Sequence, residues 1–332
     1  MKEPILEIKG LKKYFHGPLG FLRKGVRWIK AVDGVTFQVY EREIFGLVGE
    51  SGCGKSTLGK TILGIYQPTE GSVIFKGREI SHLRKKEAKE IRRDIQYVYQ
   101  DPGASLDPYW KVGRILSEPL VIHTSVSKES IRKKVLEMLD DVGLKEEHLS
   151  LYPHEFSGGQ QRRLGLARIL CLNPSLVILD EPTSGLDVSV QATILKLFIE
   201  LKRQFELTYI FISHNLSVVR MMCERMAVMY AGKIVEMGET HSIFHHPFHP
   251  YTKVLLAAIP EVGKKLDKVK DLSLFGEPPN PENFPVGCRF WPRCTYKMAI
   301  CESVEPELKG EVNGRTVACH LFQPQKRRIS IA

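Results

Sequence analysis

The sequence lacks any long run of hydrophobic residues. Although 43% of its 332 residues are hydrophobic, no stretch approaches the roughly 20 apolar residues that a helix needs to cross a bilayer. The opening residues, MKEPILEIKG, also lack the apolar segment that a secretory signal places between a basic end and a small-residue cleavage site. We therefore expect a folded cytosolic chain that brings no membrane-spanning helices of its own.

Concentrated charge of one sign is also scarce. The formal net charge is +10, but only residues 82–93 and 325–330 are densely basic. In the first of these stretches, Glu87 and Glu90 are interleaved at helical spacing, as on a solvated helix face. Such a spread of positive charge suits a position beside an anionic membrane surface, and it argues against nucleic acid as a partner.

The sequence has seven cysteines, but a cytosolic protein of this size is not expected to form a disulfide framework. Three are isolated and are predicted to be packing residues, whereas four gather near the C-terminus: Cys288, Cys294, Cys301 and Cys319. Their spacing, C-x5-C-x6-C-x17-C, has no short C-x-x-C knuckle, which argues against a zinc ribbon. Four thiolates can hold either Zn²⁺ or a 4Fe–4S cluster, and the wide spacing favours the cluster.

Short apolar strands alternate with helical patterns along most of the chain, which predicts an α/β fold with a mostly parallel sheet. Strands are predicted at 5–11, 35–40, 43–49, 71–77, 175–180, 207–213 and 225–232, and helices at 55–66 and 190–205. From about residue 101 to 170 the apolar spacing is helical, which indicates an inserted helical subdomain. After about Thr240 the chain is rich in proline, histidine and turns, which marks a C-terminal appendage.

A glycine-rich turn joins the strand at 43–49 to the helix that follows. Its residues, GESGCGKST (49–57), fit the pattern G-x-x-x-x-G-K-S/T. In this pattern the glycines turn backbone N–H groups toward phosphate oxygens, the lysine reaches the β- and γ-phosphates, and the hydroxyl binds Mg²⁺. The sequence therefore predicts a nucleoside triphosphate site made of Gly49, Ser51, Gly52, Cys53, Gly54, Lys55, Ser56 and Thr57.

Two further stretches complete the predicted nucleotide chemistry. LVILDEP (176–182) ends an apolar strand with Asp180, which can orient Mg²⁺, and with Glu181, a candidate general base. EFSGGQQRR (155–163) begins a helix with Ser157, Gly158, Gly159 and Gln160, so it offers a second anion-binding helix end. Two such ends and one loop lysine indicate that two copies share nucleotides across an interface.

GESGCGKST, FSGGQ, LVILDEP, SGLD and ISHN follow one another in this order within residues 1–240. This part of the chain resembles the nucleotide-binding subunit of an ABC transporter. The resemblance implies a P-loop NTPase fold of the ABC type, with an antiparallel β subdomain and a helical subdomain at about 101–170. It also implies ATP as the nucleotide.

The resemblance assigns further roles to matching residues. Gln100 in YVYQDP would contact Mg²⁺ and the attacking water, and His214 in ISHN would contact the γ-phosphate. Asp187 in SGLD would communicate across the dimer. Phe15 would stack on adenine, with neighbouring Tyr14 as the alternative. Mg²⁺ would be held by Ser56, Gln100 and Asp180, and the catalytic residues would be Glu181, His214 and Gln100.

The C-terminal part, residues 241–332, resembles one subfamily of ABC transporter subunits in particular. HHPFHPYTKVLLAAIP (245–260), GEPPNPENFPVGCRF and the spaced cysteines are similar to the ATPase subunits of oligopeptide and dipeptide importers. Subunits of this family carry a 4Fe–4S cluster, so the resemblance implies one at Cys288, Cys294, Cys301 and Cys319, with Zn²⁺ as the alternative.

The resemblance also implies an assembly and a place for it. The chain would hydrolyse ATP to power peptide uptake, bound to the cytoplasmic side of the inner membrane. Its partners would be a paralogous ATPase subunit, two transmembrane permease subunits and an extracytoplasmic solute-binding protein. The alternatives are an importer for another solute, such as an oligosaccharide or nickel, and a soluble ABC ATPase that acts on ribosomes or nucleic acid.

Overall fold

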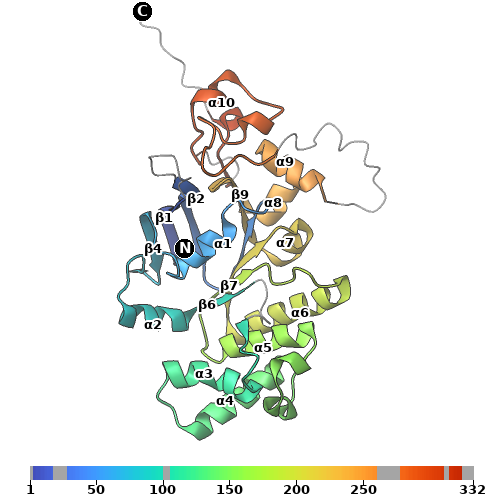
Figure 1. Ribbon diagram of the computed structural model, residues 1–332. Coiled ribbons are helices and arrows are strands. Elements are labelled where there is room, and N and C mark those ends of the chain that lie inside the picture. Colours follow the sequence, from blue (N-terminus) through green and yellow to red (C-terminus); the bar gives the residue numbers. More distant parts are fainter. Residues whose placement is uncertain (1–2, 18–27, 100–104, 260–276, 310–313, 324–332) are drawn as a thin grey trace, which may run out of the picture.

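The computed structural model describes residues 3–17, 28–99, 105–259, 277–309 and 314–323 (Figure 1). A seven-stranded sheet, in the order β11-β10-β9-β3-β8-β7-β6, forms its centre. The strands are β3 (Ile44–Val48), β6 (Ile95–Val98), β7 (Leu176–Asp180), β8 (Thr208–Ser213), β9 (Arg225–Tyr230), β10 (Lys233–Glu239) and β11 (Thr316–Val317). Strands β6 to β9 and β3 pair in parallel, whereas β10 pairs antiparallel with both β9 and β11. The predicted mostly parallel α/β sheet is confirmed.

Every residue of β3, β7 and β8 is buried, which shows that other elements cover both faces of this sheet. Alternate residues of β8 face opposite sides: Phe211 belongs to one apolar cluster, and Ile210 and Ile212 belong to another. The first cluster includes α6 (Val188–Phe205) and α7 (Leu216–Met222), and the second includes α1 (Lys55–Ile62). The core is therefore a sheet packed between two layers.

The second layer also contains an antiparallel sheet in the order β2-β1-β4-β5. Its strands are β1 (Pro4–His16), β2 (Trp28–Tyr40), β4 (Glu70–Phe75) and β5 (Arg78–Glu79), and α2 (Lys85–Asp94) follows them. The first two strands are longer than predicted, because their pairing continues from Pro4 opposite Tyr40 to His16 opposite Trp28. Helix α1 is shorter than predicted, since the chain turns at Gly64, whose φ is +71°.

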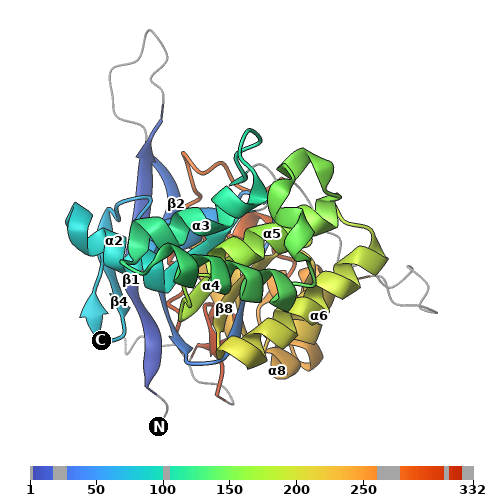
Figure 2. The same cartoon turned by 90° about the horizontal axis from the view of Figure 1, so that it is seen from below.

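The predicted helical region holds α3 (Val112–His123), α4 (Lys128–Asp141) and α5 (Gly158–Leu170). These helices pack against one another at the end of the molecule opposite the C-terminal region (Figures 1 and 2). The hydroxyl of Ser127 caps α4 and accepts a hydrogen bond from the backbone N–H of Ser130 at 3.2 Å.

The C-terminal region shares the sheet and the core of the rest of the chain. It contains α8 (Thr240–His245), α9 (Pro250–Ala257) and α10 (Ala299–Ser303). Strand β11 extends the main sheet beside β10, and Tyr251 and Phe290 are buried in the same apolar cluster as β8. The domain boundary near residue 240 stays a prediction. None of the described helices is long and apolar enough to span a bilayer.

Candidate ATP site

The loop between β3 and α1 can be built only with glycine at two positions. Gly49 has φ +154°, and a Cβ there would lie 2.1 Å from the carbonyl oxygen of Met229. Gly54 has φ +108°, and a Cβ there would lie 2.1 Å from the carbonyl oxygen of Ala31. No side chain caps the N-terminus of α1. Its backbone N–H groups are therefore available to an anion, as the sequence predicts.

Lys55 is the buried cation of this loop. Lys55 is only 6% exposed to solvent. Its Nζ donates to the carbonyl oxygens of Gly49 at 2.8 Å and Glu50 at 2.9 Å. A buried ammonium held only by neutral acceptors has no charge partner in these contacts. Phosphate oxygens fit this position because they would replace neutral carbonyls with charged acceptors.

Ser56 and Asp180, the predicted Mg²⁺ pair within the described residues, lie together. Ser56 Oγ donates to Asp180 Oδ1 at 3.0 Å, although 124 residues separate them. The second carboxylate oxygen, Oδ2, accepts a hydrogen bond from the Tyr97 hydroxyl at 2.6 Å. A hydroxyl beside a carboxylate with fixed orientation is a donor set suited to Mg²⁺.

Tyr97 was not predicted as a site residue. It lies on β6, next to β7, and is 6% exposed. Burial raises the pKa of Tyr97 well above that of a free phenol, and the carboxylate of Asp180 adds a smaller rise. The phenol therefore stays neutral and donates a hydrogen bond. The sequence signal is indirect: a tyrosine in a buried strand needs a partner for its hydroxyl.

The two predicted catalytic residues that the structure describes also come together. Glu181 and His214 follow the neighbouring parallel strands β7 and β8, and Oε2 of the carboxylate lies 2.5 Å from Nδ1 of the ring. Glu181 has φ +52°, a left-handed conformation that is uncommon outside glycine. Its backbone N–H donates to the carbonyl oxygen of Ile212 at 2.9 Å, which fixes it at the edge of the sheet.

The predicted second anion site begins α5. Ser157 and Gln160 cap the helix reciprocally: the serine N–H donates to Gln160 Oε1 at 3.0 Å, and the Gln160 N–H donates to Ser157 Oγ at 3.3 Å. A Cβ on Gly158 would meet no atom within 4 Å. Arg162 Nη2 donates to the carbonyl oxygen of Ser184 at 2.7 Å, so α5 is tied to the segment that follows Glu181.

The other residues with predicted roles lie in different parts of the fold, and one of them is outside the described residues. Asp187 caps α6 through the backbone N–H of Val190 at 2.9 Å, and the hydroxyl of Ser189 is the main cause of its lowered pKa. The Phe15 ring packs edge-on against Tyr66 at 5.2 Å between centroids. Tyr14, the alternative, donates its hydroxyl to Asp33. Gln100 lies outside the described residues.

The four clustered cysteines lie close enough to influence one another's pKa. Burial, with smaller contributions from the other three thiols, raises the pKa of Cys288 to about 12. The backbone N–H groups of Phe290, Tyr296 and Leu321, each two residues after a cysteine, lower the pKa of Cys288, Cys294 and Cys319 against the larger effect of burial. Among the described residues, however, no three or more His, Cys, Asp or Glu side chains form a group that could hold a metal ion.

This fold, with a phosphate loop, a carboxylate pair and a glycine-rich second helix end, defines a P-loop ATPase of the ABC type. Residues 32–184 match the family model of the ABC transporter, and residues 235–301 match that of the C-terminal region of the oligopeptide/dipeptide transporter. The structure of cbiO1 from Clostridium perfringens matches with a TM-score of 0.64 and 28% identity, over 74% of this chain and 92% of that one. A dimeric post-hydrolysis structure of the ATP-binding cassette MJ0796, bound to ADP and Pi, matches with a TM-score of 0.62 and 29% identity, over 71% and 98%.

Similarity to characterised relatives extends over nearly the full chain. The oligopeptide transport ATP-binding protein AppF of Bacillus subtilis is 47% identical over 97% of this chain and 98% of its own. The dipeptide transport ATP-binding protein DppF of Escherichia coli is 44% identical over 96% and 95%. The chain belongs to the ATP-binding subunits of the oligopeptide/dipeptide ABC transporters, and it is an ATPase.

Proposed function

We propose that this chain hydrolyses ATP to power the uptake of oligopeptides or dipeptides through an ABC importer. The observation that carries the proposal is the match of residues 235–301 to the C-terminal region of the oligopeptide/dipeptide transporter. This region holds none of the residues assigned to the binding or hydrolysis of ATP, so it distinguishes this subfamily from other ABC ATPases. The full-length relatives named for oligopeptide and dipeptide transport support the same solute class.

In the proposed mechanism, the phosphate loop binds the β- and γ-phosphates, and Lys55 moves from the loop carbonyls to the phosphate oxygens. Ser56 and Asp180 would hold Mg²⁺, which would neutralise charge on the phosphates when bound. Glu181 takes a proton from the attacking water, and His214, its neighbour at 2.5 Å, orients the γ-phosphate. In our proposal, Gln100 would contact both Mg²⁺ and the attacking water.

The second phosphate-binding end belongs to a partner subunit in this proposal. Ser157, Gly158, Gly159 and Gln160 would contact ATP held by the opposite loop, and Asp187 would lie near the dimer interface. The open space around Gly158 supports an intermolecular contact. We propose a paralogous ATPase chain as the partner, two transmembrane permease subunits, and an extracytoplasmic solute-binding protein, with this chain peripheral to the cytoplasmic face of the inner membrane.

Removal of the chain from its own cell is expected to abolish uptake of labelled dipeptides or oligopeptides. Uptake should return with the wild-type gene and not with the Glu181→Gln variant, because that variant lacks the proposed general base and cannot hydrolyse the ATP that powers each transport cycle. Uptake of a free amino acid serves as the matched control and should not change. Unaltered peptide uptake, with loss of oligosaccharide or nickel uptake instead, would assign the chain to another solute.

We further propose that the four clustered cysteines hold a 4Fe–4S cluster. Backbone N–H groups that lower the pKa of three of these thiols support this, since they favour the thiolate form that binds a metal. The buried Nε1 of Trp291, between Cys288 and Cys294 in the chain, has no hydrogen-bond partner among the described residues and could donate to sulfur. A single Zn²⁺ fits less well, because one ion must be reached by all four donors at about 2.3 Å.

Chemical analysis of anaerobically purified protein tests this assignment. We expect about four irons and four sulfides per chain, with a broad visible absorbance band. Cys301→Ser should lose most of the iron, whereas Cys171→Ser, at an isolated buried cysteine, should retain it. One zinc and no sulfide per chain would replace the cluster with a zinc site and leave the ATPase assignment unchanged.

A further inference from the structure

Glu50, the second residue of the phosphate loop, is held from three directions. Its carbonyl oxygen accepts a hydrogen bond from Lys55 Nζ at 2.9 Å, and its backbone N–H donates to the Tyr251 hydroxyl at 2.9 Å. Its carboxylate accepts hydrogen bonds from Arg293 at 3.1 and 3.2 Å. Tyr251 and Arg293 both belong to the C-terminal region, so that region contacts the loop predicted to hold the phosphates.

The Arg293 contact has the geometry of a strong ion pair. Each terminal nitrogen of the guanidinium donates to a different oxygen of Glu50, the two-pronged arrangement that fits a carboxylate. The arginine side chain is 6% exposed and that of Glu50 is 20% exposed. Arg293 Nη1 also donates to the Tyr230 hydroxyl at 3.2 Å, which orients the guanidinium. Burial on this scale separates the pair from an exposed surface salt bridge, which contributes little.

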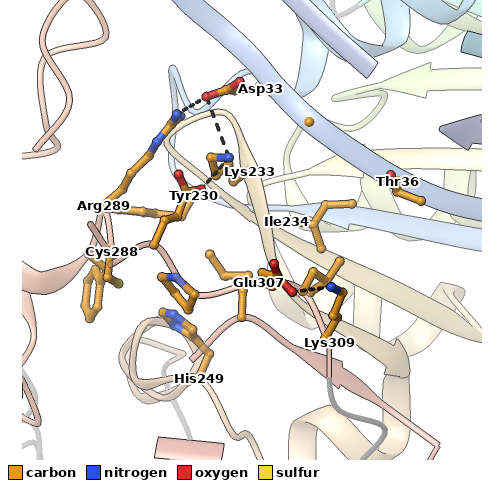
Figure 3. A pocket seen from close by; sticks show the side chains of 17 residues that line it. Asp33, Thr36, Tyr230, Lys233, Ile234, His249, Cys288, Arg289, Glu307 and Lys309 are labelled. Carbon is orange, nitrogen blue, oxygen red and sulfur yellow. Dashed lines mark hydrogen bonds and ion pairs between the residues drawn. The ribbon is translucent and has the colours of Figure 1, made fainter. Parts of the chain in front are cut away.

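Further contacts fix the C-terminal region beside the same loop. Arg289 donates to Asp33 of β2, and Lys233 lies 3.8 Å from the same carboxylate (Figure 3). The backbone N–H of Lys30 donates to the carbonyl oxygen of Pro281 at 3.2 Å. A cavity of about 260 Å³ lies between this proline-rich segment and residues 50–53 of the phosphate loop. Arg293 therefore belongs to a region that contacts the rest of the chain at several points beside the loop.

We propose that Arg293 is a positioning residue for ATP binding that acts through Glu50. Its ion pair holds the backbone of the phosphate loop in one conformation before the nucleotide arrives. Less conformational entropy is then lost when the phosphates bind, which raises the affinity. Because such coupling is reciprocal, bound ATP should in turn stabilise the segment that carries Arg293.

Nucleotide affinity of the full-length chain tests this role. Arg293→Met and Glu50→Gln should each weaken binding of Mg-ATP by about tenfold, within the usual range of coupling between sites. The double variant should bind no more weakly than the single variants, because both changes break one contact. Arg293→Lys should recover part of the affinity. The matched control is Arg42→Ala, which breaks the exposed Arg42–Glu206 pair at 2.7 Å and should leave affinity unchanged.

A purely structural role for Arg293 gives a different pattern. Arg293→Met would then lower the unfolding midpoint without changing ATP affinity, or the losses of the two single variants would add; either result overturns the proposal. Should Arg293→Met fail to fold, Glu50→Gln still decides, since wild-type affinity in that variant also overturns it. This experiment measures nucleotide binding only. A result that overturns the role of Arg293 would therefore not affect the proposed solute class.

Hydrogen exchange gives an independent readout. In the wild-type chain, ATP should slow exchange of the backbone amides at 288–294, and in Glu50→Gln this protection should be largely lost. Equal protection in both proteins would contradict transmission through Glu50.

Discussion

A Glu181→Gln chain is expected to lose ATP hydrolysis by about 10²–10⁴-fold while it still binds ATP. Glu181 follows Asp180 at the end of β7, with its carboxylate 2.5 Å from Nδ1 of His214. A side-chain amide cannot take a proton from water, but it keeps the shape of the carboxylate and one of its two acceptor oxygens. Phosphate release by the assembled transporter and ATP binding to the isolated chain measure the two effects separately.

The matched control for this prediction is Glu200→Gln on α6. Its carboxylate is 59% exposed and lies 3.8 Å from Lys196, an arrangement that contributes little. Hydrolysis should therefore stay at the wild-type rate. If Glu181→Gln also hydrolysed ATP at that rate, Glu181 would not be the general base, and another group near His214 would have to take the proton.

Much of the ATP site could be predicted because its chemistry lies in short, local motifs. Parallel strands end at the same edge of a sheet, so residues after β7 and β8 had to lie near the loop after β3. That geometry explains why Ser56 meets Asp180, and Glu181 meets His214, across long stretches of sequence.

Contacts between side chains that no pair of motifs links could not be predicted. Tyr97 is a site neighbour only because β6 pairs with β7, and its hydroxyl then reaches Asp180. Arg293 and Glu50 are 243 residues apart, and neither belongs to a motif that requires the other. The sequence pattern of the C-terminal region suggested an appendage, whereas its packing against the phosphate loop depends on the folded sheet.

The strand ends were mispredicted for a local reason. The pairing of β1 with β2 is interrupted by register shifts, one of them between Ile8 and Leu11. Each shift breaks the alternation of inward and outward side chains, which is the signal that the sequence offers. The apolar pattern therefore ends near residue 11, although the strand continues to His16.

Lys55→Ala is expected to lose ATP binding as well as hydrolysis, with kcat/KM reduced by about 10²–10³-fold or more. The substitution removes the buried ammonium and leaves the carbonyl oxygens of Gly49 and Glu50 without their donor. No other contact replaces that charge at the phosphates in our proposed mechanism. Equilibrium binding of a fluorescent ATP analogue and steady-state phosphate release measure the loss, and urea unfolding checks that the chain is folded.

Lys60→Ala provides the matched control, because it removes a lysine from the last turn of the same helix and leaves the loop intact. Binding and hydrolysis should then stay near wild type. The two active-site variants differ in a way that separates their roles: Glu181→Gln should bind ATP without turnover, whereas Lys55→Ala should not bind it. A folded Lys55→Ala chain with wild-type ATP affinity would mean that the loop N–H groups and Mg²⁺ suffice to hold the phosphates, and that Lys55 acts only once the nucleotide is in place.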